Sequence, residues 1–193
     1  MQAVILAGGE GTRLRPLTYT VPKPVIPLAN RPFIAYMIEW LARHGVSDVI
    51  MACGFLSDGV RDVLGDSHED VAIRYVTEPE ARGTGGGVKF AQELLEERFL
   101  VLNGDVLTDF DLSSVQRVHA ERGAKATLSL IPVDDPSAYG LVRTGPDDEI
   151  LAFLEKPEPQ EIDTKMRGGG GGGGCAPLDP LSCRSAGLRP SPA

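Results

Sequence analysis

The chain has 193 residues, of which 42% are hydrophobic and 24% charged, and these ordinary globular values exclude a mini-protein scaffold, a fibrous repeat and wholesale disorder. A formal net charge of −8 argues against nucleic-acid binding, because proteins that bind the phosphate backbone present basic faces. No apolar run approaches the roughly 18 residues of a membrane span, and no basic leader opens the chain. We therefore expect a cytoplasmic protein that binds neither nucleic acid nor membrane.

Glycine is the residue type that departs from ordinary composition. Seven of the 23 glycines are consecutive, from Gly168 to Gly174, and the residues after them show neither a helical nor a strand period. Residues 1–167, by contrast, alternate short apolar runs with longer amphipathic ones. We therefore predict one folded domain over residues 1–167, and a glycine-rich stretch with a disordered tail over residues 168–193.

The pattern of residues 1–167 predicts strands and helices in alternation. Short apolar runs predict strands at 4–6, 48–53, 71–76, 99–102 and 126–133. Apolar residues at helical spacing predict helices at 33–44, around 60–64, at 87–97, and from a capping Asp111 to Arg122. Two late strands, at 141–143 and 150–154, are separated by turn residues and predict a hairpin.

This alternation predicts an α/β fold, namely a Rossmann-like, mostly parallel sheet with helices on both faces. Ligands of such sheets bind outside the carboxyl ends of the strands. Three loops follow predicted strand ends and are therefore the candidates for a site: those after Leu6, Val76 and Leu102.

The first of these loops has three glycines in four positions, Gly8, Gly9 and Gly11. Glycines let backbone N–H groups turn toward an anion, so the loop is a candidate phosphate cradle. A tight structural turn explains the glycines equally well. The loop lacks the Gly-Lys-Ser/Thr ending of a Walker sequence. It also lacks the third glycine of a dinucleotide-binding fingerprint at the required offset.

Two cations favour the functional interpretation of this loop. Arg13 lies inside it, and Lys23 follows between Pro22 and Pro24. Because prolines fix φ, we expect the two prolines to hold Lys23 in an extended segment and to limit where its ammonium can lie.

Residues 6–18 (LAGGEGTRLRPLT), followed by Pro22-Lys23-Pro24 and Pro27, resemble the signature of the sugar-1-phosphate nucleotidyltransferases, also called nucleotide-sugar pyrophosphorylases. The resemblance implies an enzyme that joins a nucleoside triphosphate to a sugar 1-phosphate and releases pyrophosphate. It implies catalytic roles at the phosphates for Arg13 and Lys23. It also implies nucleotide binding by the residues of the loop: Leu6, Ala7, Gly8, Gly9, Gly11 and Thr12.

The second and third loops also resemble segments of this family. In residues 78–87 the resemblance implies contact with the base, through Glu80, Gly83 and Thr84, although a flexible helix entrance is the alternative. Asp105, in Asn103-Gly104-Asp105, resembles the family's metal ligand and implies bound Mg²⁺. A lone aspartate after glycine is otherwise more often a turn residue.

Two further matches concern the sugar side of the site. Gly140 resembles the family's sugar-contacting turn, and Glu155-Lys156-Pro157 resembles the motif that binds the sugar hydroxyls and the sugar phosphate. By composition alone, Glu155 and Lys156 are equally a surface pair before a proline-rich loop.

The resemblance ends near residue 160, and the family's Asn-Ala-Gly segment and second metal-binding aspartate do not follow. Our hypothesis is that the reading frame slipped in the glycine tract, so that the tail is an out-of-frame product. A family enzyme represented by a truncated chain is the favoured function. The alternatives are a non-catalytic nucleotide-binding or regulatory module and a site completed by another chain. The mannose-1-phosphate guanylyltransferase branch looks most similar, while glucose with thymidylyl or uridylyl transfer, and assembly into a homo-oligomer, stay open.

Overall fold

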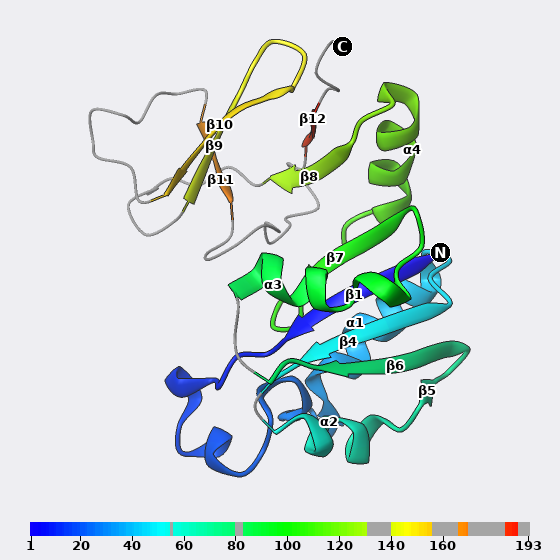
Figure 1. The fold of residues 1–193 in the computed structure, drawn as a ribbon, viewed down its shortest axis with the longest axis vertical. Coiled ribbons are helices and arrows are strands. Elements are labelled where there is room, and N and C mark those ends of the chain that lie inside the picture. The colour runs from blue at the N-terminus through cyan, green and yellow to red at the C-terminus, as the bar shows by residue number, and fades with distance from the viewer. Residues whose placement is uncertain (55, 80–82, 131–139, 156–165, 170–183, 189–193) are drawn as a thin grey trace. The chain divides into compact units, whose positions relative to one another are not determined.

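The computed structural model describes residues 1–193 except 55, 80–82, 131–139, 156–165, 170–183 and 189–193. Contacts within it divide the chain into two compact units, Met1–Leu107 and Thr108–Ala193, which are described separately (Figure 1). The division at residue 167 that the sequence suggests stays a prediction. In the described part of the chain, no helix combines the length and the apolar character needed to cross a bilayer.

The first unit is built on a five-stranded sheet in the order β5-β6-β4-β1-β7. Four of the strands are parallel neighbours, and the short β5 is antiparallel to β6. This confirms the predicted mostly parallel sheet. The strands are β1 (Gln2–Ala7), β4 (Asp48–Cys53), β5 (Ser67–His68), β6 (Val71–Thr77) and β7 (Phe99–Asn103).

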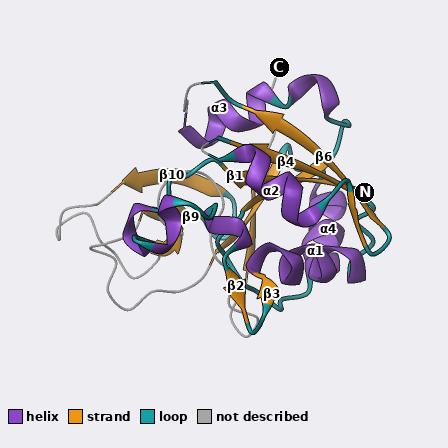
Figure 2. Ribbon diagram, turned by 90° about the horizontal axis from the view of Figure 1, so that it is seen from below, coloured by secondary structure: helices purple, strands orange, loops and turns teal. Residues whose placement is uncertain are grey.

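Helices cover both faces of this sheet, as predicted. The connections through α1 (Phe33–Arg43) and α2 (Ser57–Leu64) run in one direction along the sheet, and the connection through α3 (Gly83–Phe90) runs in the other. Because such crossovers are right-handed, α1 and α2 lie on one face and α3 lies on the other (Figure 2). On the α3 face, Val4, Ile50 and Ala52 pack with Ala91.

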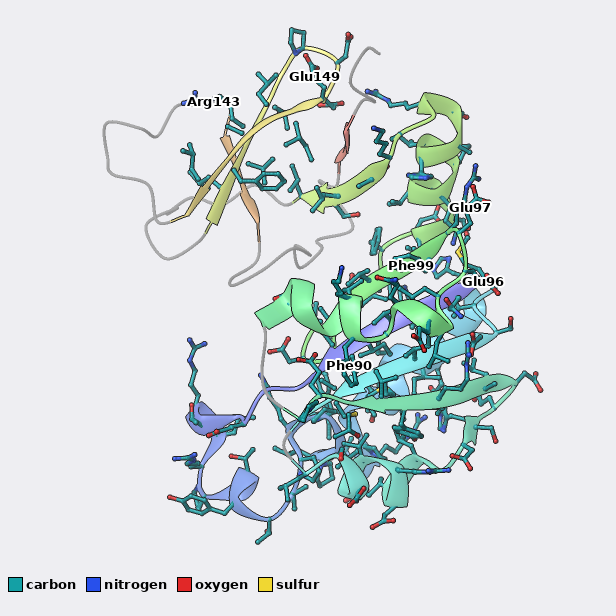
Figure 3. The ribbon with its side chains drawn as sticks, viewed as in Figure 1. Phe90, Glu96, Glu97, Phe99, Arg143 and Glu149 are labelled. Carbon is teal, nitrogen blue, oxygen red and sulfur yellow. The ribbon has the colours of Figure 1, made fainter. Side chains whose placement is uncertain are left out.

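The helix expected at 87–97 begins and ends earlier than predicted. The structure has α3 over Gly83–Phe90, with Phe90 partly exposed at its end (Figure 3), and then a single 3₁₀ turn over Gln92–Leu94. The backbone changes from an α-helix to a 3₁₀ turn at the fully buried Ala91. Leu95 after this turn is extended and leads toward β7.

A short hairpin that the sequence did not predict precedes α1. Its strands are β2 (Pro27–Leu28) and β3 (Arg31–Pro32), and the two residues between them, Ala29 and Asn30, both have positive φ. Two-residue hairpin turns of this kind require positive φ at both central positions, where glycine and asparagine are usual. Because alanine occupies the first of these positions, the turn could not be predicted from the sequence.

The second unit contains one described helix and five described strands. Helix α4 (Leu112–Arg122) begins as predicted at Asp111, whose carboxylate accepts the Ser113 N–H at 3.0 Å. The predicted late hairpin is confirmed by antiparallel β9 (Gly140–Thr144) and β10 (Ile150–Glu155), with Glu149 at its turn (Figure 3). The strand expected at 126–133 is β8 (Ala126–Leu130), and its last residues lie outside the described ones.

Two short strands occur where the sequence showed no strand period. β11 (Met166–Gly169) pairs with β9, and β12 (Arg184–Leu188) pairs with β8. Backbone pairing requires no particular side chain, so even two glycines of the consecutive run can extend a sheet edge. The other residues of the predicted tail lie outside the described ones.

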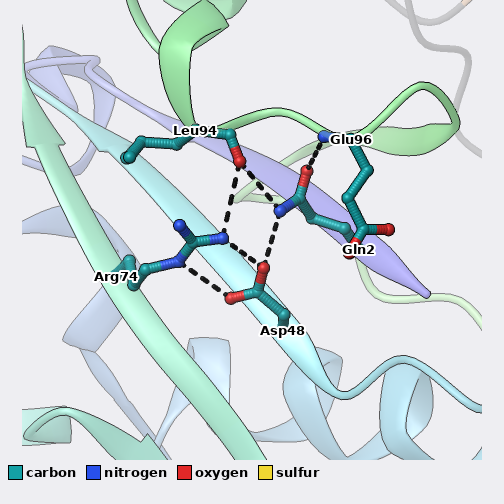
Figure 4. Close-up of polar contacts among 5 residues, drawn as sticks. All are labelled: Gln2, Asp48, Arg74, Leu94 and Glu96. Carbon is teal, nitrogen blue, oxygen red and sulfur yellow. Dashed lines mark hydrogen bonds and ion pairs between the residues drawn. The ribbon is translucent and has the colours of Figure 1, made fainter.

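Gln2 and Asp48, at the amino ends of β1 and β4, form a polar network with Arg74 from the middle of β6 (Figure 4). The Gln2 side chain is buried, and its Nε2 donates to Asp48 Oδ2 at 2.6 Å and to the Leu94 carbonyl at 3.0 Å. Its Oε1 accepts the Glu96 N–H at 2.9 Å, and Arg74 donates to both oxygens of Asp48. The network thus fixes the segment between α3 and β7 against three strands.

We predict that Asp48→Asn lowers the free energy of unfolding at pH 7 by about 1–2 kcal/mol, because it weakens charge-assisted hydrogen bonds to the half-exposed Arg74. Burial alone would raise the pKa of Asp48, but the hydrogen bonds from Arg74 and Gln2 and the charge of Arg74 lower it below its ordinary value of 3.8. A lowered folded-state pKa adds stability above the unfolded-state pKa and loses it as pH falls. The difference between wild type and variant should therefore shrink below about pH 4.

Denaturant unfolding at several pH values measures this difference. Asp66→Asn is the matched control, because the Asp66–Arg61 pair is far more exposed, with 68% and 60% of the side chains accessible. We expect the control to change stability by less than about 0.5 kcal/mol. A variant as stable as wild type at pH 7 would show that the network does not stabilise the fold.

Candidate functional site

The candidate site lies at the carboxyl ends of the parallel strands in the first unit. β1 is hydrogen-bonded to β4 on one side and to β7 on the other, so the direction in which the chain proceeds along the sheet reverses at β1. Such a reversal is the topological switch point where open α/β sheets bind their ligands. The three predicted loops, after β1, β6 and β7, all leave the sheet at this edge.

Glycines bring the backbones of these loops into direct contact. A Cβ atom on Gly54, which follows β4, would lie 2.8 Å from the carbonyl oxygen of Gly8, and one on Gly104 would lie 3.0 Å from the carbonyl oxygen of Leu6. The Gly104 N–H also donates to the Leu6 carbonyl at 2.8 Å. Gly54 is a site residue that sequence reasoning missed, because no motif surrounds it. Its position directly after the predicted strand 48–53 was the available signal.

The remainder of the first loop turns on Gly11. Gly11 has a φ of +63°, and a Cβ there would lie 2.8 Å from Thr18 Cγ2 and 3.2 Å from Lys23 Cβ. The buried Thr18 hydroxyl donates to the Gly11 carbonyl at 2.8 Å, and a 3₁₀ turn over Thr12–Leu14 follows.

The outer side of this loop is accessible to solvent. Arg13 lies on the 3₁₀ turn and is exposed, and Gly8, Gly9 and Thr12 are also exposed. The conformation of the loop backbone is therefore fixed by internal contacts, while its outer surface is accessible to a ligand.

The segment that holds Lys23 is a 3₁₀ turn over Lys23–Val25 rather than the extended segment that we expected. The proline constraint was right but its consequence was wrong, because the φ of proline also suits a 3₁₀ helix. The Val25 N–H donates to the Pro22 carbonyl at 3.1 Å, and Pro22 and Pro24 are both buried. Pro22 also packs closely on Gly59 of α2. Both ends of the lysine's backbone are thus anchored.

The structure brings together Lys23 and Asp105, two residues for which the resemblance implied separate roles. Lys23 Nζ donates to Asp105 Oδ2 at 2.5 Å, and the side chains are 33% and 46% exposed. They are 82 positions apart in sequence and meet between the first and third loops. Cation, carboxylate and backbone N–H groups therefore share one strand-end region, as binding of a phosphate with a metal ion requires.

The second loop contributes Glu78, which sequence reasoning also missed. Its N–H donates to the Cys53 carbonyl at 3.0 Å, and its Oε1 would lie 2.6 Å from a Cβ on Gly87, where Leu6 Cδ2 would lie 3.1 Å away. The carboxylate of this half-buried residue thus lies beside Gly87, in the middle of α3, and close to Leu6 of β1. Of the predicted base-contacting residues, Gly83 (φ +71°) and Thr84 open α3, and Glu80 lies outside the described residues.

The predicted sugar-side residues belong to the second unit. Gly140 begins β9 and Glu155 ends β10, and the antiparallel register places them directly opposite each other. The structure therefore brings these two positions together, from separate motifs. Lys156 lies outside the described residues.

Asp105 fits a magnesium ligand by its chemistry. Mg²⁺ is usually held by one or two carboxylates while phosphates and water complete its octahedron. Asp105 offers one accessible carboxylate that already has a cation, the Lys23 ammonium, against it.

Within the described part of the chain, ligand-type side chains also gather at Glu39, His68 and Glu69, with atoms within 4.8 Å of one another. Glu39 there already pairs with Arg31, and the group lies at the amino end of β6, away from the strand ends of the site.

The fold and the loops together define a class: α/β proteins that bind a phosphate-bearing ligand at the switch point of a parallel sheet. More particularly, the chain belongs to the nucleotidyl transferase family, which it matches over residues 2–170. It is 41% identical over 165 residues to a mannose-1-phosphate guanylyltransferase of Mycobacterium tuberculosis, covering 84% of this chain and 46% of that protein. The chain spans about half the length of the curated relatives it matches.

Two solved structures agree with this assignment. HddC from Yersinia pseudotuberculosis, solved in complex with GMP-PN, is 28% identical with a TM-score of 0.65, over 86% of this chain and 72% of that one. A UDP-glucose pyrophosphorylase solved with UDP-glucose has a TM-score of 0.73 at 21% identity, over 86% of this chain and 73% of that one. The second likeness shows a shared fold.

We predict that Gly54→Ala lowers the free energy of unfolding by about 1–3 kcal/mol, because its Cβ must displace the Gly8 backbone. Gly9→Ala is the matched comparison, since nothing lies within 4 Å of a Cβ there, and its stability should stay within about 0.5 kcal/mol of wild type. Both variants should bind nucleotide more weakly. Gly54→Ala shifts the loop after β1, and Gly9→Ala places a methyl group on the outer surface of that loop. Denaturation curves and calorimetric titration measure the two effects. Full nucleotide affinity in Gly9→Ala would contradict a binding role for the loop.

Proposed function

We propose that this chain carries the nucleotide half, and part of the sugar half, of a site that transfers a guanylyl group from GTP to mannose 1-phosphate, giving GDP-mannose and pyrophosphate in the cytoplasm. The contact between Lys23 and Asp105, with Lys23 packed beside Gly11 of the first loop, is the observation that carries the proposal. The relative that is a mannose-1-phosphate guanylyltransferase supports guanine as the base and mannose as the sugar.

The reaction requires no protein nucleophile. An oxygen of the sugar phosphate forms a bond to the α-phosphorus, and the bond from that phosphorus to the bridging oxygen breaks. Pyrophosphate leaves with the electron pair. Because two anions must approach each other, catalysis depends on orientation and on stabilisation of the developing charge.

The residues nearest the reacting phosphates and the sugar have the following roles in this scheme. Backbone N–H groups of Gly8 and Gly9 bind the nucleotide, and Arg13 and Lys23 supply positive charge to its phosphates. Asp105 would hold Mg²⁺, which when bound neutralises phosphate charge. In the second unit, Gly140 and Glu155, together with Lys156, would hold the sugar 1-phosphate.

Glu78 supports guanine over a pyrimidine base. Guanine presents two adjacent N–H donors, N1–H and N2–H, on its pairing edge, and a carboxylate can accept both. Uracil and thymine present a single N–H between two carbonyl oxygens, and these oxygens would face the charge of Glu78. The position of Glu78 directly after β6 and close to Leu6 supports this role.

A panel of triphosphates tests the proposed reaction. We expect pyrophosphate release from GTP with mannose 1-phosphate, and much slower release from UTP or dTTP or with glucose 1-phosphate. Calorimetric titration of each triphosphate runs in parallel. Binding of GTP without turnover would instead indicate a non-catalytic nucleotide-binding module, and a preference for UTP or dTTP would contradict the guanylyl assignment.

Lys23→Ala should lower turnover at saturating substrate by about ten- to a hundredfold. A charge-assisted hydrogen bond is worth about 1.5–3 kcal/mol, and each 1.36 kcal/mol of barrier is about tenfold in rate. Arg13→Ala should have a similar effect. Lys125→Ala is the control, since Lys125 is an exposed lysine between α4 and β8 with no role in the scheme. If Lys23→Ala retained wild-type turnover, Lys23 would have no role in the mechanism.

Glu78→Gln should reduce the preference for GTP over UTP by about tenfold or more, because it removes a charge that favours two donors and disfavours carbonyl oxygens. The ratio of kcat/KM for the two triphosphates is the measurement. Glu93→Gln, on the 3₁₀ turn after α3, is the charge-matched control. An unchanged ratio would show that another group selects the base.

A further inference from the structure

The Lys23 ammonium lies against the carboxylate that the proposed function gives to the metal. Lys23 Nζ is 2.5 Å from Asp105 Oδ2, and the Asp105 side chain is 46% exposed. An ammonium and a divalent cation both need the oxygen atoms of this carboxylate, and they repel each other at short range. Strong binding of both cations to Asp105 at the same time is therefore unfavourable.

We propose that Lys23 acts as a stand-in cation for Asp105 in the free protein, so that Asp105 binds metal well only after the ammonium has moved away. This inference rests on the proposed role of Asp105 as metal ligand. A triphosphate offers the ammonium other anions and so favours its release. Metal and triphosphate therefore bind cooperatively, and each raises the affinity for the other by the same factor.

The local structure suits a side chain that changes partner while its backbone stays in place. Buried Pro22 and Pro24 anchor the backbone, and Pro22 packs on Gly59 of α2. The lysine side chain, by contrast, has four rotatable methylene groups and is 33% exposed. An ion pair with this much solvent access contributes little to stability, so exchange of its partner costs little.

Binding of Mn²⁺ in the absence of nucleotide is the first test. Free Mn²⁺ is counted by its electron paramagnetic resonance signal during titration of the full chain. We expect Lys23→Met to bind Mn²⁺ about five- to tenfold more tightly than wild type, because the competing and repelling ammonium is gone. Arg61→Met, which makes the same change in charge at the exposed Asp66 pair, should bind like wild type.

Asp105→Asn separates failure of this inference from failure of the proposed function. If Asp105→Asn abolishes Mn²⁺ binding but Lys23→Met binds no better than wild type, Asp105 remains the ligand and the stand-in role is wrong. If Asp105→Asn leaves Mn²⁺ binding unchanged, the metal assignment itself is wrong. Equal gains in Lys23→Met and Arg61→Met would also overturn the stand-in role, because they would reflect net charge alone.

Acetylation of lysines by acetic anhydride, followed by mass spectrometry, tests release of the ammonium without a Lys23 variant. The exposed Lys89 of α3 serves as the internal reference. In wild type, saturating Mg²⁺ should raise the labelling of Lys23 relative to Lys89 at least about threefold. In Asp105→Asn the labelling should be high from the start and insensitive to Mg²⁺. Wild-type labelling that does not respond to bound metal would overturn the proposal.

Discussion

Strand β1 is hydrogen-bonded along both edges, to β4 and to β7, and the geometry of the candidate site in the first unit follows from this constraint. A strand paired on two sides cannot slide or tilt without breaking hydrogen bonds to both neighbours. The end of β1 is therefore fixed, and the Leu6 carbonyl there accepts the Gly104 N–H. The close approach of Gly54 to Gly8 then fixes the start of the first loop. Loops that come from three separate parts of the sequence are thereby held to one rigid strand end.

The ion pair between Lys23 and Asp105 is a consequence of this geometry and not its cause. Both side chains are at least one-third exposed, and such pairs contribute little to folding. The positions of the two residues are set instead by buried Pro22 and Pro24 and by the contact of Gly104 with β1. A pair that the fold does not need can be broken without loss of structure. This is the physical reason why the same two side chains can take the roles proposed for them.

Much of this arrangement could be predicted from sequence because it depends on local patterns. The runs at 48–53 and 71–76 form strands, and Asp111 caps a helix, since hydrophobic pattern and capping are properties of neighbouring residues. The contact of Lys23 with Asp105 and the role of Gly54 could not be predicted, because they depend on which strand ends become neighbours. The 3₁₀ turn at Lys23 was misjudged because the φ of proline fits two conformations. β11 and β12 were missed because backbone pairing leaves no mark on side-chain pattern.

The charge distribution explains how an acidic chain can bind anionic ligands. The formal net charge of −8 repels a triphosphate at long range, but salt screens charges separated by more than roughly 8–10 Å. Within that distance the relevant groups are the Lys23 ammonium, the exposed Arg13 and the N–H groups of the glycine loop. Without a neighbouring cation, the Asp105 carboxylate would repel a phosphate. A cation beside the carboxylate offsets this repulsion. In the function proposed above, affinity for an anion therefore depends on keeping Asp105 paired with a cation at every stage, first with lysine and then with metal.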